Sequence, residues 1–146
     1  MFRGRYFHTI DPKGRLSIPA KFREVLKERY GTNLIIAHFQ DCLAAYPHEE
    51  WTKLEQKLLE LPSLQMEVRN FLRRFVSSGV ECEVDGNGRV LLPSSSRELA
   101  GLSRDAVLVG LMNKFEIWSR ERWDEFMRRP DGSFEEISQK LSALGV

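Results

Sequence analysis

The chain of 146 residues is long enough for one compact domain or two very small ones, and 42% hydrophobic residues suffice for a core. No apolar run approaches the roughly 18 residues that cross a bilayer, and the first ten residues lack an apolar signal segment, so we expect a soluble, unexported, cytoplasmic protein. A net charge of +1 gives by itself no reason to expect nucleic-acid binding, which therefore depends on local charge.

The first half of the chain predicts four strands, a tight turn and two helices. The strands are expected at 5–10, 15–18, 34–39 and 43–47. Asp-Pro-Lys-Gly lies between the first two strands, and its glycine, proline and aspartate favour a hairpin turn. A short helix is predicted over 20–29, after Pro19, and a longer one starts near Pro47.

A helix predicted over 63–75 links this half to a second one with the same order of elements. The strands of the second half are expected at 80–84, 89–92, 106–111 and 115–118. Its turn is Asp-Gly-Asn-Gly, and its short helix is predicted over 94–102, after Pro93. Another helix follows the last strand, and a C-terminal helix is predicted over 133–144.

The two halves are copies of one another. A shift of 74 positions places Asp11 on Asp85, Gly14 on Gly88, Arg15 on Arg89, Leu16 on Val90, Ile18 on Leu92, Pro19 on Pro93, Arg23 on Arg97 and Glu24 on Glu98. Each half has too few strands to bury its own apolar face, so residues 1–76 and 77–146 are expected to pair about a pseudo-twofold axis. The predicted fold is α+β, with two tandem β-hairpin half-domains forming one small β-barrel flanked by helices.

The repeated aspartate and arginine have a structural and a functional explanation. Asp11 can pair with Arg15, and Asp85 with Arg89, as ion pairs that brace each turn. The same guanidinium groups at a turn can instead reach phosphates or base edges. By contrast, the repeated glycines and prolines need only a structural explanation.

The first copy is the more basic of the two. Lys13 lies at its turn tip, and Arg3 and Arg5 share one face of the preceding strand by alternation. In the second copy Asn87 replaces the lysine, and two acids precede the turn. The candidate contact residues are Arg3, Arg5, Asp11, Lys13, Arg15, Asp85 and Arg89.

Other features favour ordinary structural roles. A basic cluster is more often a solvated surface than a nucleic-acid site, and this holds also for the arginine-rich run at 69–74. Trp51 and Trp123 occupy equivalent positions, which indicates core or interface packing. Cys42 and Cys82 lack a Cys-x-x-Cys partner and are interpreted as buried free thiols. Without a catalytic motif or phosphate-binding loop, we expect no enzyme, no metal site and no cofactor.

Five segments resemble the MraZ family of bacterial transcriptional regulators: MFRGRY, DPKGRLSIPAKFRE, DGNGRVLLP, ELAGL and VLVGLMNKFEIW. The wider resemblance is to the AbrB/SpoVT group of DNA-binding domains, whose swapped hairpins usually come from two chains. The resemblance spans nearly the whole chain. It implies that both hairpins come from this one chain, and that Asp11 to Arg15 and Asp85 to Arg89 are DNA-binding motifs.

The resemblance also implies a ring-shaped homo-oligomer that binds tandem short repeats in promoter DNA. It implies repression of the protein's own division and cell-wall gene cluster, in the cytoplasm and associated with the nucleoid. The alternative is an oligomeric scaffold or protein-interaction module whose basic hairpins bind an acidic partner.

Overall fold

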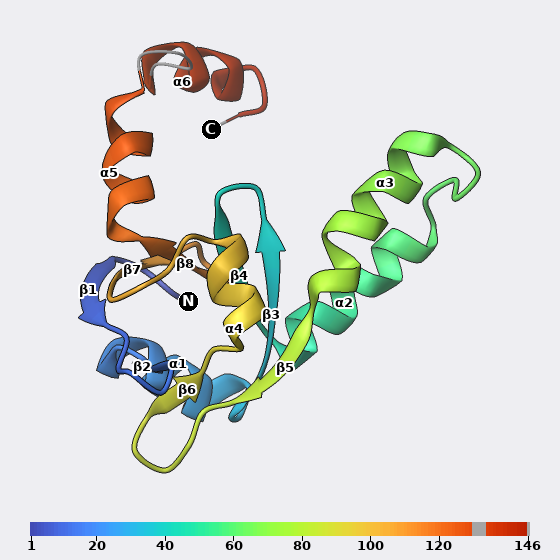
Figure 1. Cartoon of the computed structure of the whole chain (residues 1–146). Helices are drawn as coiled ribbons and strands as arrows, with labels where there is room; N and C mark the ends of the chain where they lie inside the picture. Colours follow the sequence, from blue (N-terminus) through green and yellow to red (C-terminus); the bar gives the residue numbers. More distant parts are fainter. Residues whose placement is uncertain (130–133, 146) are drawn as a thin grey trace.

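The computed structural model describes residues 1–129 and 134–145 and shows an α+β chain (Figure 1). The strands are β1 (Arg5–Thr9), β2 (Arg15–Ser17), β3 (Asn33–Phe39), β4 (Cys42–Pro47), β5 (Val80–Glu83), β6 (Arg89–Leu91), β7 (Asp105–Gly110) and β8 (Phe115–Ser119). The helices are α1 (Ala20–Arg29), α2 (His48–Leu59), α3 (Met66–Arg74), the 3-10 turn η1 (Val76–Ser78), α4 (Ser94–Leu99), α5 (Arg120–Arg128) and α6 (Phe134–Ser142). Every predicted element is present, although Ser133, the predicted start of the last helix, lies outside the described residues.

The strand order shows the duplication in space. Six antiparallel strands form one sheet in the order β1-β7-β8-β4-β3-β5, and β2 pairs with β6 in a separate two-stranded ribbon. Exchanging the two halves turns β1 into β5, β7 into β3 and β8 into β4, which leaves the sheet order unchanged. The expected tandem half-domains related by a pseudo-twofold axis are therefore confirmed, with β4·β8 and β2·β6 at the axis.

In a simple hairpin the two strands that flank the turn pair with each other in a ladder. The strands that flank each repeated turn here do not. The first turn closes through the Asp11 N–H to the Arg15 carbonyl, and one bridge joins Ile10 to Leu16. Beyond that bridge β1 pairs with β7, and β5 pairs with β3, so each half completes the sheet of the other. Strands of three to five residues bury more apolar surface in this exchange than in isolated hairpins.

The main core lies between the sheet and the ribbon. In β2 and β6 the central residues Leu16 and Val90 are fully buried, while their neighbours face outward. Phe2, Phe22 and Phe115 meet at the centre with ring centroids 5.0 to 5.4 Å apart. Because both halves contribute these side chains, neither half encloses a complete core.

The outer face of the sheet carries two smaller clusters that repeat each other. Tyr46 of β4 packs edge to face on Trp51 of α2 at 5.3 Å, and Trp118 of β8 packs in the same way on Trp123 of α5 at 5.4 Å. The predicted packing role of Trp51 and Trp123 is confirmed, since both are buried.

Two helical arms project from the sheet. The first arm consists of α2 and α3, the second of α5 and α6, and the β3–β4 hairpin rises between them (Figure 1). In residues 1–129 and 134–145, no helix is both long and apolar enough to cross a membrane.

Candidate nucleic-acid interface

The first repeated turn is organised by the Asp11 carboxylate. Its Oδ1 accepts the backbone N–H groups of Lys13 and Arg15, both at 2.9 Å, and its Oδ2 accepts the Arg15 Nε at 2.7 Å. These bonds, with the Arg15 N–H first, hold the pKa of Asp11 below its ordinary value. The predicted ion pair is confirmed, and it persists until the pH falls through that lowered pKa.

The second turn has the same backbone but a different side-chain arrangement. Asp85 Oδ1 accepts the N–H groups of Asn87 at 2.8 Å and Arg89 at 3.0 Å, and the Arg89 N–H bond is the main cause of its lowered pKa. The predicted ion pair between Asp85 and the Arg89 side chain is wrong. The Arg89 Nε is instead buried without a hydrogen-bond partner.

The ribbon brings the two motifs together. Arg15 lies opposite Leu91, and Ser17 lies opposite Arg89. The pair between them, Leu16 and Val90, faces the core. Arg15 and Arg89 are therefore diagonal neighbours on the outer face, and about 7–8 Å separates their backbones across the two strands. The positive charge of Arg15 also helps to lower the pKa of Asp85, so the two turns lie in one electrostatic field.

The structure separates Arg3 and Arg5 from this cluster. Six residues of extended chain place Arg5 about 20 Å from Asp11, and its guanidinium lies 5.2 Å from the ring centroid of Trp123 in α5. Arg3 precedes the strand, and Gly4 between the two has a φ of +95°. The strand begins at Arg5, so the predicted alternation along it does not extend to Arg3.

Two further arginines cover the turns and were not predicted as site residues. A side chain at Gly88 would meet Arg23 at 2.6 Å, and one at Gly14 would meet the Arg97 guanidinium at 3.1 Å. Arg97 Nε also donates to the Leu92 carbonyl at 3.1 Å. Each helix thus covers the turn of the other half. The 74-residue shift already pairs these two arginines, which is the signal that could have identified them.

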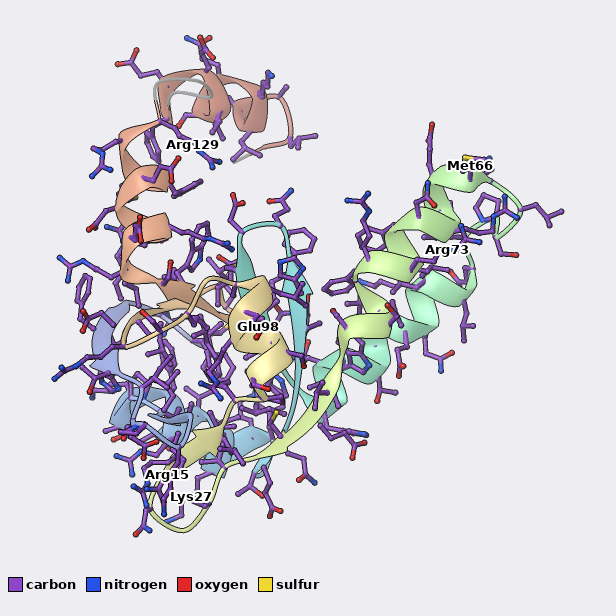
Figure 2. All side chains as sticks on the ribbon, in the orientation of Figure 1. Arg15, Lys27, Met66, Arg73, Glu98 and Arg129 are labelled. Atoms are coloured by element: carbon purple, nitrogen blue, oxygen red, sulfur yellow. The ribbon has the colours of Figure 1, made fainter. Side chains whose placement is uncertain are left out.

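The ribbon end of the molecule carries an excess of positive charge. Five basic residues line the two turns, against the two motif aspartates: Lys13, Arg15, Arg23, Arg89 and Arg97. Figure 2 shows Arg15 and Lys27 at this end, far from Met66 and Arg129 on the arms. The ribbon end of a nearly neutral chain is therefore locally basic, as nucleic-acid binding requires.

Replacing Gly88 with alanine is expected to destabilise the fold, whereas replacing Gly86 in the same turn is not. Gly88 has a φ of +75°, which costs a residue with a Cβ about 1–2 kcal/mol, and the new Cβ displaces Arg23. Thermal denaturation should show a Tm lower by about 2–8 °C for Gly88→Ala. A Cβ at Gly86 has open space within 4 Å, so equal Tm values for the two variants would contradict this account.

The described residues offer little for catalysis. In residues 1–129 and 134–145, no group of three His, Cys, Asp or Glu side chains is placed to hold a metal ion. Cys42 and Cys82 are buried free thiols, as predicted. Burial raises the pKa of Cys82 to about 11 and that of Cys42 further, so both stay protonated at neutral pH.

Comparison with known proteins identifies the family of this chain. The family model described as "MraZ protein, putative antitoxin-like" matches twice, over residues 1–74 and 75–143. The chain is 44% identical over 145 residues to the "Transcriptional regulator MraZ" of Syntrophobacter fumaroxidans, covering 99% of this chain and 97% of that protein. It is 47% identical over 146 residues to the protein of the same name from Desulfitobacterium hafniense strain Y51, covering all of both. These relatives are named as regulators of transcription, not as enzymes, and the chain belongs to the MraZ family.

Proposed function

We propose that this protein is a sequence-specific DNA-binding transcriptional regulator that contacts DNA through the β2–β6 ribbon. The observation that carries this proposal is the convergence of both Asp-x-x-x-Arg motifs on one outward-facing, positively charged ribbon. A two-stranded ribbon fits the major groove of B-DNA, and arginine is the side chain that most often contacts guanine there.

The two halves contribute unequally in this proposal. Asp11 holds Arg15 through its Nε, which leaves the terminal guanidinium nitrogens for a base edge or a phosphate. Lys13 and Arg89 add contacts to the phosphate backbone of the DNA. Asp85 supports the second turn. Arg5 begins β1 and Arg3 precedes it, both away from the first turn, and both are assigned to more distant phosphates.

One ribbon carries too few charges to hold DNA tightly, so we propose a ring-shaped homo-oligomer on tandem promoter repeats. Several ribbons binding at once raise the affinity by about two to four orders of magnitude without new kinds of contact. The target proposed from the family resemblance is the protein's own division and cell-wall gene cluster, which it represses. This places the protein in the cytoplasm, at the nucleoid.

Binding to the DNA upstream of its own gene, measured over a salt series, tests this function. The logarithm of the binding constant should fall linearly with that of the salt concentration, with a slope of about 0.9 per phosphate contact. Scrambled DNA of the same length should bind more weakly at every salt concentration. If neither DNA binds at low salt, the scaffold alternative replaces the regulator.

A further inference from the structure

The second repeated turn lacks the cation that the first one carries at its tip. Asn87 stands where the first turn has Lys13, and the strand before it contains Glu81 and Glu83. The motif cation of this turn is Arg89, whose Nε is buried. Because phosphates are bound chiefly by lysine and arginine, contact with DNA through both turns requires further positive charge beside the second one.

Helix α1 of the first half brings that charge to the second turn. Its Arg23 side chain comes within 2.6 Å of the point that a Cβ on Gly88 would occupy, so α1 lies over this turn. Lys27 follows one helical turn further along α1, and residues at this spacing share one face of a helix. Both cations are exposed, and Figure 2 shows Lys27 at the ribbon end of the molecule, as it does Arg15.

A cavity of about 360 Å³, the α1 groove, lies between α1 and the second turn. Helix α1 contributes Arg23 and Lys27 to its lining, and the turn contributes Asp85 and Gly86. Asp85 Oδ1 already accepts two backbone N–H groups. In residues 1–129 and 134–145 neither cation of the groove forms an ion pair. Like charges four residues apart on a helix repel each other, and a bound anion relieves that repulsion.

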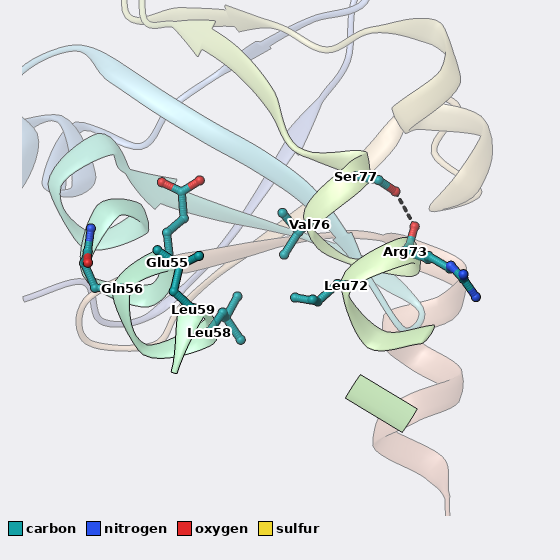
Figure 3. Close-up of a pocket in the computed structure, with 8 residues that line it drawn as sticks. All are labelled: Glu55, Gln56, Leu58, Leu59, Leu72, Arg73, Val76 and Ser77. Atoms are coloured by element: carbon teal, nitrogen blue, oxygen red, sulfur yellow. Dashed lines mark hydrogen bonds between the residues drawn. The ribbon is translucent and has the colours of Figure 1, made fainter. Parts of the chain in front are cut away.

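The α1 groove suits a phosphate, in contrast to the cavity of about 590 Å³ between α2 and α3. Four of the eight residues that line the latter are aliphatic: Leu58, Leu59, Leu72 and Val76 (Figure 3). In the α1 groove the two cations donate hydrogen bonds to an anion. A Cβ at Gly86 would meet nothing within 4 Å, so this side of the turn is open to a DNA backbone.

We propose that the α1 groove binds a backbone phosphate of the DNA through Arg23 and Lys27. The first half then supplies the positive charge that the second turn lacks. The reverse arrangement does not occur, because the shift of 74 residues pairs Lys27 with Gly101, beyond the end of α4 at Leu99. This inference rests on the DNA-binding function proposed above and adds a second phosphate contact to its ribbon.

Replacing Lys27 with glutamine in the full chain tests this contact. Fluorescence anisotropy over a salt series should show that operator and scrambled DNA lose affinity by the same factor. The salt slope should fall by about 0.9 for each bound ribbon. The Tm should match the wild type, because Lys27 is exposed. The matched control is Arg29→Gln, which removes one charge from the opposite face of α1, beside Tyr30, and should bind like the wild type.

A second variant moves the lysine to the turn itself. Combining Lys27→Gln with Asn87→Lys gives the second turn the lysine of the first. The turn accommodates it, because the N–H of Asn87 makes the same bond to its aspartate as that of Lys13. The double variant should therefore recover the wild-type salt slope.

Three results would overturn the groove contact: wild-type binding by Lys27→Gln, a loss confined to operator DNA, or a double variant without recovery. If binding still depends on Arg15 in that case, the groove fails and the DNA-binding function stands. If the wild type binds neither DNA, both proposals fail together.

Discussion

Residues 1–76 expressed alone are expected to remain unfolded as a monomer. In this fragment β1 loses β7, the strand with which it pairs, and β2 loses β6. The central core also loses Phe115, Val90 and every other side chain of the second half. Each large apolar side chain left exposed forfeits about 1.5–3 kcal/mol, and a few such losses exceed the whole stability of a small domain. Circular dichroism in urea should show no cooperative transition.

Adding residues 77–146 to the fragment provides the control. The second half supplies the missing strands, so an equimolar mixture should recover a cooperative unfolding transition. A folded 1–76 homodimer would retain the exchange of strands, with a second copy in place of the other half. A fragment that unfolds sharply while sedimenting as a monomer would contradict the fused-dimer architecture.

The positions of the elements could be predicted from the sequence because local signals determine them. Proline directly precedes α1, α2 and α4, and the two glycine-containing turns separate runs of β-forming residues. The match between the two halves at a shift of 74 residues also predicted the pseudo-twofold axis that relates them. The partner of each strand could not be predicted in this way. Two copies of one motif have the same alternation of apolar residues, so pairing within a half and pairing between halves satisfy the pattern equally well.

The candidate site could be predicted where its contacts are local. Asp11 and Arg15 are four residues apart, and their bond follows from the turn itself. Arg5 contacts Trp123, which is distant in the sequence, and Arg23 covers a glycine of the other half. Contacts of this kind depend on the exchange of strands, so no spacing rule reveals them. The repeated Asp-x-x-x-Arg motif also differs between its two copies. Asp11 and Arg15 form the ion pair, whereas the Arg89 Nε lacks a hydrogen-bond partner.

Replacing Arg15 with alanine is expected to abolish or strongly weaken operator binding while the fold and the assembly persist. The turn survives because the Asp11 carboxylate still accepts two backbone N–H groups, and an ion pair this exposed adds little to stability. A lost arginine–guanine contact costs about 1–3 kcal/mol, or roughly 5–150-fold in affinity for one ribbon, and the losses multiply when several ribbons bind together. Fluorescence anisotropy with operator and scrambled DNA measures this effect.

Two further variants identify what Arg15 contacts. Arg15→Lys keeps the charge but loses the planar pair of donors, so it restores binding if the contact is a phosphate and fails to do so if the contact is a guanine edge. A base contact also means that Arg15→Ala lowers the preference for operator over scrambled DNA, whereas a phosphate contact lowers both affinities alike and reduces the salt slope. The matched control is Lys114→Ala, which removes one charge from the opposite face of the sheet, above Tyr46, and should leave binding unchanged. A folded Arg15→Ala protein with wild-type affinity for both DNAs would show that the ribbon is not the DNA-binding surface.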